Sequence, residues 1–233
     1  MKLIGLVDCN NFFVSCERLF RPDLQHTPVV VLSSNDGCVV ARSKEVKDLG
    51  VPMGVPLFQV RELFANEGVV TFSSNFALYR DISSRVMATL KEEVGYVEQY
   101  SVDEAFFIID VPDPSVAHKQ ARSIKARVER DVGVPVSVGL AKTKTIAKCA
   151  TDVAKKGNGV AVLVGDTWRA RTHDIPLSSV WGIGGKTAQK MRTHELTTVA
   201  DLCAADPARI ERLFGVHGAR LQSELSEQPV HER

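Results

Sequence analysis

Hydrophobic positions in the first 164 residues fall into short apolar runs separated by longer amphipathic stretches. Short runs bounded by turn residues predict strands, and apolar positions repeating every three to four residues predict helices. The predicted strands span residues 3–7, 29–34, 97–101, 105–110, 135–141 and 159–164. The predicted helices span residues 11–19, 43–49, 76–94, 115–132 and 143–155.

From residue 166 onward the pattern contains only helices and turns. Mixed strands and helices followed by a helical tail predict an α+β body with a separate small helical domain. Local signals support the proposed boundaries, because Asn35-Asp36-Gly37 is typical of a turn and Gly50 of a helix stop. Asn75 is a candidate N-cap for the long helix that follows it.

Two acidic residues interrupt the most apolar pair of predicted strands. Asp103 and Glu104 lie between Val102 and Ala105, so a strand–turn–strand hairpin would carry both at its tip. Charged groups are costly to bury without a partner, and adjacent carboxylates raise each other's pKa unless a cation joins them. A divalent metal ion is the cation that suits such a group of oxygen ligands.

A third carboxylate, Asp8, stands where the first apolar strand ends. An Asp in this position most often caps a turn or a helix, and Asp103 with Glu104 could equally form a solvated turn. An apolar strand that delivers one Asp beside a hairpin tip with two further carboxylates could frame one or two Mg²⁺ ions. Taken together, the two features favour a metal site.

Composition narrows the class of protein without indicating a function. The chain has 233 residues, 44% of them hydrophobic, which permits one large domain or two to three small ones. No apolar run reaches transmembrane length, and five cysteines without paired spacing predict reduced thiols in a cytoplasmic protein. Because the net charge is only +1, any surface for nucleic acid must be local.

Several motifs follow one another along the chain, at residues 8–13, 37–43, 101–106, 139–145, 154–156 and 181–184. In this order they resemble the Y-family (translesion) DNA polymerases. Residues 18–24 and 33–38 are most similar to the UmuC-type catalytic subunit of bacterial DNA polymerase V. The resemblance covers essentially the whole chain and is therefore more specific than any single motif.

The resemblance implies a division into polymerase domains. Residues 1–20 and 75–164 would form the palm, a sheet backed by helices, and residues 21–74 would form small inserted fingers. Residues 165–233 would form an all-helical thumb. Relatives carry a further DNA-binding domain after the thumb, the little finger, so we expect this sequence to be a fragment that binds DNA weakly and extends primers poorly.

The implied activity is template-directed addition of dNTPs to a primer 3′-hydroxyl, in DNA damage tolerance and SOS mutagenesis. Two Mg²⁺ ions (Mn²⁺ being a possible substitute) would lie roughly 3.5–4 Å apart, one at the attacking oxygen and one at the triphosphate. By resemblance, Asp8 and Asp103 would bridge both ions and Glu104 would bind the ion at the primer terminus. The backbone carbonyl of Cys9 would bind the triphosphate-side ion.

The resemblance also implies a nucleotide site, made of Asn11, Phe12, Phe13, Arg42, Lys47 and Lys155. Phe13 would be the steric gate, an aromatic ring that leaves no room for a ribose 2′-hydroxyl, whereas Phe12 is expected in the core. Backbone N–H groups at this helix start could cradle phosphate. Lys47 and Lys155 match triphosphate-binding positions of the family. Lys148 shares a helix face with Lys155, but we expect it to be an ordinary solvated charge.

A glycine-rich segment near residue 182 has the pattern of a helix-hairpin-helix. Gly182 and Gly184 would allow a tight turn, and the helix that follows would present free N–H groups to a DNA phosphate. Lys186 and Lys190 would add positive charge on that helix. A plain glycine turn between two helices is the alternative interpretation.

Three functions are compatible with these features. The first is an active translesion polymerase, the second a catalytically silent DNA-binding scaffold in lesion bypass, and the third a nucleotidyl cyclase on a similar palm. The presence of all three carboxylates favours the active polymerase over the silent scaffold. A cyclase would not explain the helix-hairpin-helix pattern. The implied partners are primer–template DNA, dNTP, a processed UmuD-type subunit, RecA and the sliding clamp, with no membrane and with nucleoid association during activity.

Overall fold

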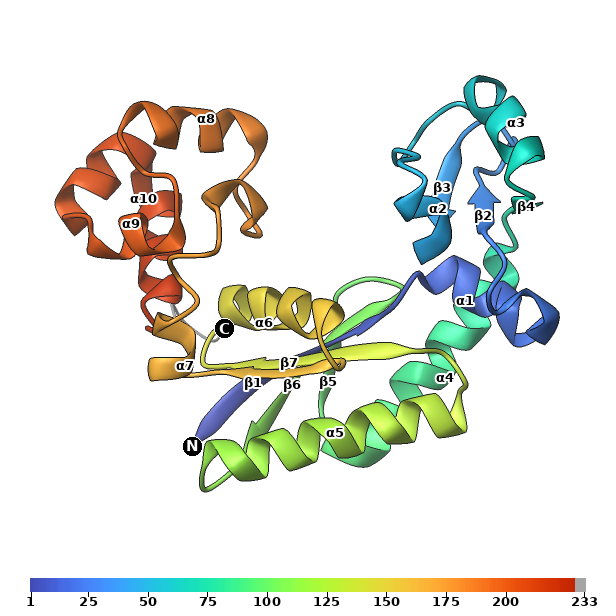
Figure 1. The fold of residues 1–233 in the computed structure, drawn as a ribbon. Coiled ribbons are helices and arrows are strands. Elements are labelled where there is room, and N and C mark those ends of the chain that lie inside the picture. Colours follow the sequence, from blue (N-terminus) through green and yellow to red (C-terminus); the bar gives the residue numbers. More distant parts are fainter. Residues whose placement is uncertain (229–233) are drawn as a thin grey trace.

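A five-stranded mixed sheet forms the body of the structure, a computed structural model that describes residues 1–228 (Figure 1). Its strands are β1 (Lys2–Cys9), β5 (Val97–Gln99), β6 (Glu104–Asp110), β7 (Val136–Ala141) and β8 (Val160–Leu163). They lie in the order β5-β6-β1-β7-β8. Strand β1 is antiparallel to both of its neighbours, so the end that carries Asp8 lies between β6 and β7.

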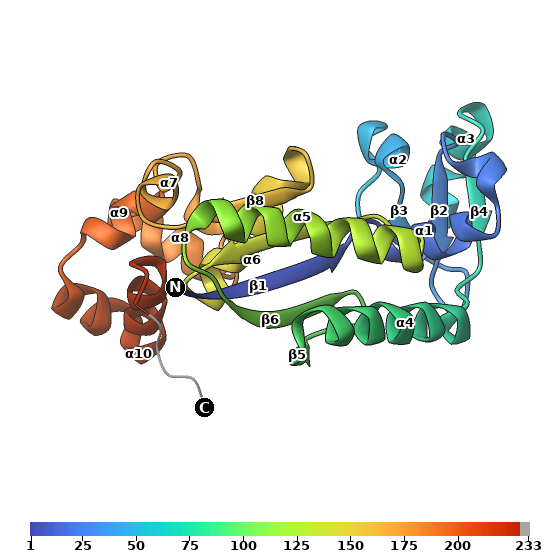
Figure 2. The ribbon, with the colours of Figure 1, turned by 90° about the horizontal axis from the view of Figure 1, so that it is seen from below.

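Helices cover both faces of this sheet because its central strand is apolar on both sides. Leu3 and Val7 pack with α4 (Phe76–Val94) and α5 (Pro114–Asp131) on one face. Leu6 packs with α6 (Lys144–Lys156) on the other face. Figure 2, seen from below, shows α4 and α5 along the sheet on the side away from α6.

A glycine in β7 brings α6 unusually close to the sheet. A Cβ added at Gly139 would lie 2.4 Å from the backbone nitrogen of Thr151 and 2.7 Å from the carbonyl oxygen of Ala147. Only glycine therefore permits this approach. The Thr143 hydroxyl caps the start of α6 by accepting a hydrogen bond from the Ile146 N–H.

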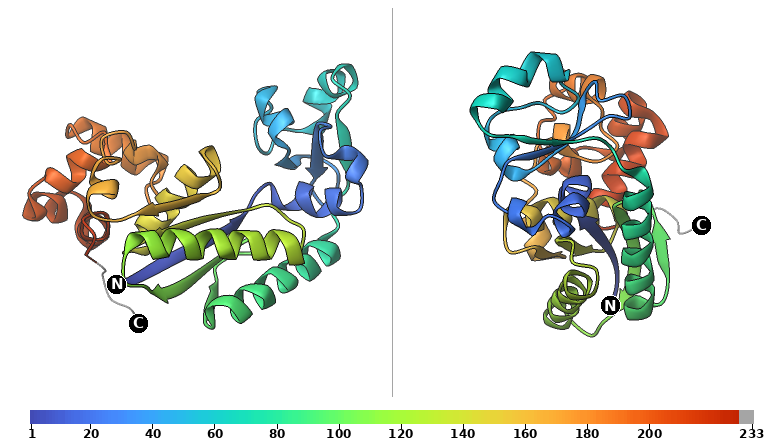
Figure 3. Two further views of the ribbon diagram at one scale, coloured as in Figure 1. Left: turned by 60° about the horizontal axis from the view of Figure 1, so that its bottom comes forward. Right: turned by 90° about the vertical axis from the view of Figure 1, so that its right-hand side faces the viewer.

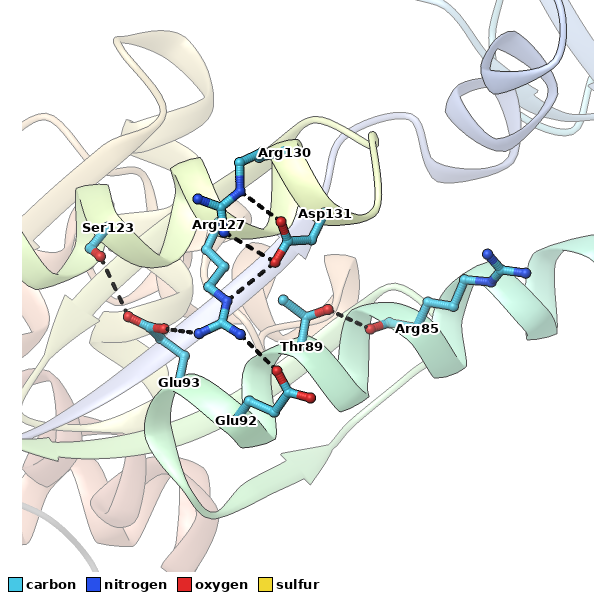
Figure 4. Close-up of polar contacts among 8 residues, drawn as sticks. All are labelled: Arg85, Thr89, Glu92, Glu93, Ser123, Arg127, Arg130 and Asp131. Carbon is cyan, nitrogen blue, oxygen red and sulfur yellow. Dashed lines mark hydrogen bonds and ion pairs between the residues drawn. The ribbon is translucent and has the colours of Figure 1, made fainter.

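An ion-pair network on the surface fastens α4 to α5 (Figure 4). The Arg127 guanidinium of α5 donates to Glu92 at 2.7 Å and to Glu93 at 3.0 Å, both on α4. The same guanidinium lies 3.3 Å from Asp131, one helical turn further along α5. The network joins the ends of the two helices on the face of the sheet opposite α6.

A second, three-stranded sheet was not fully predicted. The small subdomain comprises β2 (Val29–Leu32), β3 (Val39–Arg42), α2 (Lys44–Asp48), α3 (Leu57–Asn66) and β4 (Val70–Phe72). The sequence predicted β2 and α2 but missed β3, α3 and β4. Both missed strands are only three or four residues long, and β4 is not fully buried at any position, so their apolar patterns are weak.

The chain reaches the small subdomain through α1 (Phe12–Leu19) and the short 3₁₀ turn η1 (Pro22–Leu24) and leaves it into α4. Strand β2 pairs antiparallel with β3 and parallel with β4. The subdomain has an apolar core of its own, built around Val30, Val46 and Phe64. Both connections to the body therefore lie at the same end of the large sheet.

Residues 166–225 form a helical unit, as the sequence predicted. It contains α7 (Asp166–Arg169), η2 (Leu177–Ser179), α8 (Gly185–Thr193), α9 (Val199–Ala204) and α10 (Pro207–Leu225). Its core is continuous with the α6 side of the sheet, because Trp168 and Met191 belong to the same apolar cluster as Ile146. Among residues 1–228, no helix has the length and apolar character needed to cross a membrane.

The small subdomain and the helical unit stand at opposite ends of the large sheet and on the same side of it (Figure 1). The views in Figure 3 show the same arrangement from two further directions. Helix α6 lies on the sheet between them, on the side where both units stand.

Candidate active site

The pairing of β1 with β6 brings the predicted carboxylates together. Asp8 lies directly opposite Glu104, and the Cys9 N–H donates to the Asp103 carbonyl at 2.9 Å. Because Cys9 and Asp103 form a hydrogen-bonded pair, Asp8 and Glu104 form the closer, non-hydrogen-bonded pair, with Cα atoms about 4.5 Å apart. Their side chains leave the same face of the sheet.

A tight turn holds Asp103 beside this pair. The predicted strand at residues 97–101 stops at Gln99, because the N–H groups of Tyr100 and Ser101 both donate to the Glu104 carbonyl. The Ser101 hydroxyl then donates to the Asp103 carboxylate at 2.7 Å. The hairpin tip therefore carries Asp103 as the sequence predicted, whereas Glu104 is already the first residue of β6 because it pairs with Asp8.

Two lysines from α6 neutralise the strand carboxylates. Lys155 Nζ lies 2.8 Å from Asp8 Oδ2, and Lys148 Nζ lies 2.6 Å from Glu104 Oε1. The two lysines are seven residues apart, so two helical turns place them over adjacent strands. With each carboxylate turned to its own partner, no three His, Cys, Asp or Glu side chains within residues 1–228 converge as a set of metal ligands.

Burial strongly perturbs Asp8. Desolvation raises the pKa of Asp8 to about 6; Lys155 opposes this shift, and the negative charges of Glu104 and Asp103 add to it. Desolvation disfavours the Lys155 ammonium, but Asp8 more than offsets this, so the pKa of Lys155 is raised. The repulsion among the three carboxylates would be relieved by further positive charge, and their oxygens are the ligands that a hard divalent cation takes.

The cysteine beside Asp8 is suited to act through its backbone alone. Burial, followed by the charges of Asp103 and Asp8, raises the pKa of the Cys9 thiol well above its usual value. Burial also raises the pKa of Cys16 and of Cys149 to about 12. All five cysteines are free thiols; Cys9, Cys16 and Cys149 are buried, and the partly exposed ones are Cys38 and Cys203.

A cavity of about 290 Å³ opens between the carboxylates and the small subdomain. All the residues predicted to be catalytic, to bind metal or to bind nucleotide line this cavity: Asp8, Cys9, Asn11, Phe12, Phe13, Arg42, Lys47, Asp103, Glu104 and Lys155. Val40, Ala41 and Met53 complete the lining and were not predicted, although the first two lie inside a motif that the sequence singled out.

The wall opposite the carboxylates is basic. Lys47 Nζ donates to Asn11 Oδ1 at 2.6 Å, which ties the small subdomain to the start of α1. Burial lowers the pKa of Lys47, and the positive charges of Arg42 and Lys155 lower it further. Because these three cations repel one another across the cavity, an anion between them would be favoured.

The start of α1 adds backbone donors to this wall. Asn11 adopts a left-handed conformation, with φ 44°, and its side chain does not cap the helix. The Arg42 guanidinium donates to the Val51 carbonyl, which fixes its position beside the cavity. An uncapped helix start among positive side chains is a favourable place for a phosphate group.

One aromatic ring forms a fixed side of the cavity. Phe13 stacks on Tyr79 with ring centroids 4.4 Å apart and an interplanar angle of 17°, while Phe76 meets it edge-on. The Tyr79 hydroxyl donates to Glu17 at 2.8 Å, so this support is itself anchored. Phe12 is buried in the core and Phe13 only partly so, as the sequence predicted.

A separate groove of about 690 Å³ lies between α8 and α10. Gly182, with φ +89°, makes the turn before α8, and Gly184 is the N-cap of that helix. Lys186 and Lys190 line the groove, and the Lys190 ammonium already donates to the Leu213 carbonyl. Of the four residues predicted to bind DNA, Gly182, Lys186 and Lys190 line this groove, and none of the four lines the carboxylate cavity.

Comparison with known proteins identifies the family. The model of the impB/mucB/samB family matches residues 7–152, which include the carboxylates and the small subdomain. The chain belongs to this family. Protein SamB of Salmonella typhimurium is 40% identical over 96% of the chain and 54% of its own length. Protein UmuC of the same species is 43% identical over 99% of the chain and 56% of its own length.

Other relatives of this impB/mucB/samB member are described as polymerases. DNA polymerase IV 1 of Bacillus subtilis is 31% identical over 97% of the chain and 55% of its own length. The chain therefore spans just over half the length of the curated relatives it matches. The motif resemblance to Y-family polymerases is confirmed by this family membership together with the fold.

Solved structures share the fold of this family member. A structure described as an insertion ternary complex of Dbh DNA polymerase has a TM-score of 0.85 at 23% identity, covering 99% of this chain and 69% of that chain. DinB from Sulfolobus solfataricus has a TM-score of 0.81 at 23% identity, covering 97% and 67% respectively. The sequence predicted an α+β fold with a sheet backed by helices, and these likenesses confirm it.

Sequence reasoning gave Lys148 no role in the site. The sequence predicted that Lys148 is an ordinary solvated charge. The structure instead places Lys148 among the carboxylates, through its ion pair with Glu104. The seven-residue spacing from Lys155 was the signal that both lysines lie on the helix face that meets the sheet. Tyr79 was missed too, because its contact with Phe13 joins two residues that lie 66 positions apart in the chain, on different helices.

Proposed function

We propose that this chain carries the nucleotidyl-transfer site of a translesion-type DNA polymerase, which adds dNTPs to a primer 3′-hydroxyl in DNA damage tolerance. The observation that carries the proposal is a cavity lined by three carboxylates, by three cations, of which Lys155 pairs with Asp8, and by a fixed aromatic ring. These are the groups needed for a metal-assisted transfer of a nucleotide.

The carboxylates would hold the metal. Asp8, Asp103 and Glu104, with the Cys9 carbonyl, would bind two Mg²⁺ ions, or Mn²⁺ in their place. Bound metal supplies activation of the attacking oxygen and neutralisation of the phosphates. Hard oxygen ligands suit these ions. Burial, and then the charges of Glu104 and Asp103, raise the pKa of Asp8, so a cation bound beside it would stabilise its ionised form.

The other walls would bind the nucleotide. Arg42, Lys47 and Lys155 would hold the triphosphate, helped by backbone N–H groups at residues 11–13. The Phe13 ring would lie under the sugar and exclude a 2′-hydroxyl. Holding the reacting groups in one geometry supplies much of the acceleration in such a transfer, because the protein does little covalent chemistry itself.

The rest of the fold suits the same proposal. The body of the protein at residues 1–20 and 75–164 would serve as the palm, the insertion at 21–74 as the fingers and the helical unit from residue 165 as the thumb. The turn at Gly182, with Gly184, Lys186 and Lys190, would grip the duplex backbone without reading its sequence. A processed UmuD-type subunit, RecA and the sliding clamp are partners proposed on the resemblance alone.

Primer extension tests the proposed activity. The 233-residue chain should insert a complementary dNTP on a primer–template in the presence of Mg²⁺, and Asp103→Ala should reduce the rate at least about 10²-fold. Asp110→Ala, at the far end of β6 and outside the cavity, is the matched control and should keep wild-type insertion. Binding of primer–template without any insertion would instead support a DNA-binding scaffold.

A further inference from the structure

A second cavity lies on the other side of the same carboxylates. It has a volume of about 300 Å³ and lies between the sheet, α6 and the start of the helical unit. Asp8, Glu104 and Lys155 line both this cavity and the candidate nucleotide cavity, so they form the partition between the two. Lys148 and Trp181 line the second cavity and not the candidate nucleotide cavity, and Trp181 also lines the groove between α8 and α10.

In the second cavity, the Lys148 ammonium is surrounded by two aromatic rings as well as by its carboxylate partner. Its ammonium lies 2.6 Å from Glu104 Oε1, 4.9 Å from the centroid of the Tyr100 ring and 5.5 Å from that of Trp181. The rings meet at 90° with centroids 5.5 Å apart, and the Trp181 Nε1–H donates to the Tyr100 hydroxyl at 3.2 Å. Only 17% of the Lys148 side chain and 16% of the Glu104 side chain is exposed.

The two rings come from different parts of the fold. Tyr100 belongs to the hairpin that carries Asp103, whereas Trp181 precedes the glycine turn that leads into α8. A surface lysine paired with a carboxylate needs no aromatic neighbours, and it gains little from the pairing. Two ring faces around one ammonium give that ammonium a second stabilising partner that does not depend on the carboxylate.

We propose that Lys148 is a tethered counter-ion for Glu104. Its ammonium neutralises this carboxylate until a divalent cation binds there, and it then remains in the aromatic cage of Tyr100 and Trp181. Lys148 is thus a positioning residue, and the inference rests on the proposed function, in which Glu104 is a metal ligand. Because Trp181 belongs to the helical unit, the cage links the position of that unit to the metal site.

Charge gives the direction of the expected effect. A positive charge a few ångströms from Glu104 opposes the binding of a divalent ion there, so Lys148→Met should tighten Mn²⁺ binding on the order of tenfold. Lys148→Arg keeps the charge and should bind Mn²⁺ as the wild type does. Trp181→Leu leaves the charge but removes half of the cage, so it should weaken Mn²⁺ binding several-fold.

Lys144 provides a matched control on the same helix. It lies one turn before Lys148, pairs with Glu98 at 2.7 Å and lies 5.1 Å from the ring centroid of Phe106. Lys144→Met therefore removes the same charge from a similar setting without touching the three carboxylates. It should leave Mn²⁺ affinity within about twofold of the wild type, since its charge is more exposed to solvent.

The experiment is a Mn²⁺ titration of the full 233-residue chain, with free Mn²⁺ measured by electron paramagnetic resonance and folding checked by circular dichroism. Tryptophan fluorescence should change with Mn²⁺ in the wild type and lose that change in Trp181→Leu. If Asp8→Asn and Asp103→Asn leave Mn²⁺ binding intact, the metal assignment fails and the counter-ion proposal fails with it. If they abolish binding but Lys148→Met matches the wild type, the counter-ion proposal alone is overturned.

Discussion

The rings of Phe13 and Tyr79 lie nearly parallel, with their centroids 4.4 Å apart. Phe13 follows the strand that carries Asp8, and Tyr79 lies in the first turns of α4, so the contact ties the cavity wall to the long helix behind it. Stacked rings with an anchored hydroxyl resist displacement better than a single ring on a surface. The Phe13 ring is therefore a rigid boundary.

Phe13→Ala should relax the choice between deoxyribonucleotides and ribonucleotides. Removing the ring opens space beside the proposed sugar position, so ribonucleotide insertion should rise about tenfold or more relative to dNTP insertion. Single-nucleotide insertion with matched dNTP and rNTP measures the ratio. Phe20→Ala, at an exposed ring outside the cavity, is the control; an unchanged ratio in Phe13→Ala would refute the gate.

Gly139→Ala should push α6, the helix that carries Lys148 and Lys155, away from the sheet. The new Cβ would lie 2.4 Å from the Thr151 backbone nitrogen, so α6 must move away from β7, at a cost of about 1–3 kcal/mol in the free energy of unfolding. Urea titration measures that free energy. In Gly157→Ala, the control at the C-cap of the same helix, the nearest atom is 3.6 Å away and little change is expected.

Asp8→Asn should alter how stability depends on pH. The unfolded Asp8 carboxyl has its usual pKa of 3.8 and the folded one a pKa of about 6, so between these values the folded state binds the additional proton. The free energy of unfolding therefore falls as pH rises through this window, by up to about 3 kcal/mol. Above pH 6 the contribution is constant.

The check is a comparison of unfolding free energies at pH 4 and pH 7. Wild type should lose stability relative to Asp8→Asn over this interval, because the variant has no carboxyl to deprotonate. Parallel pH profiles for the two proteins would show that burial does not raise this pKa.

Lys186→Ala should weaken binding to all DNA sequences equally. A lysine that contacts a phosphate releases counterions on binding, so its loss should reduce the slope of log affinity against log salt by about 0.9. Fluorescence anisotropy of labelled duplexes at several salt concentrations measures the slope. Lys119→Ala, on α5 at the opposite face of the sheet, serves as control; a loss confined to particular sequences would contradict a backbone contact.

The parts of the site that were predictable are local or lie on adjacent strands. Asp103 and Glu104 are adjacent where the turn meets β6, and the pairing of β1 with β6 follows from two strong apolar patterns, so Asp8 could be expected nearby. The spacing of Lys148 and Lys155 predicted a shared helix face. That spacing could not predict which carboxylate each lysine meets.

The missed features depend on packing between distant segments. Strands β3 and β4 acquire their identity only by pairing with β2, since neither has a long apolar pattern of its own. The sequence pattern places Trp181 in a glycine turn, and nothing in the residues around it predicts its contact with Tyr100. Such contacts become visible only when the helical unit is packed against α6.

The distribution of cysteines makes the native chain suited to spectroscopic labelling. Burial keeps the thiols of Cys9, Cys16 and Cys149 protonated and shielded, whereas Cys38 and Cys203 are partly exposed, although burial also raises the pKa of Cys203. Cys38 lies in the small subdomain and Cys203 on α9 of the helical unit. Two probes attached without any substitution would therefore span the molecule from one arm to the other and report their separation as DNA and nucleotide bind.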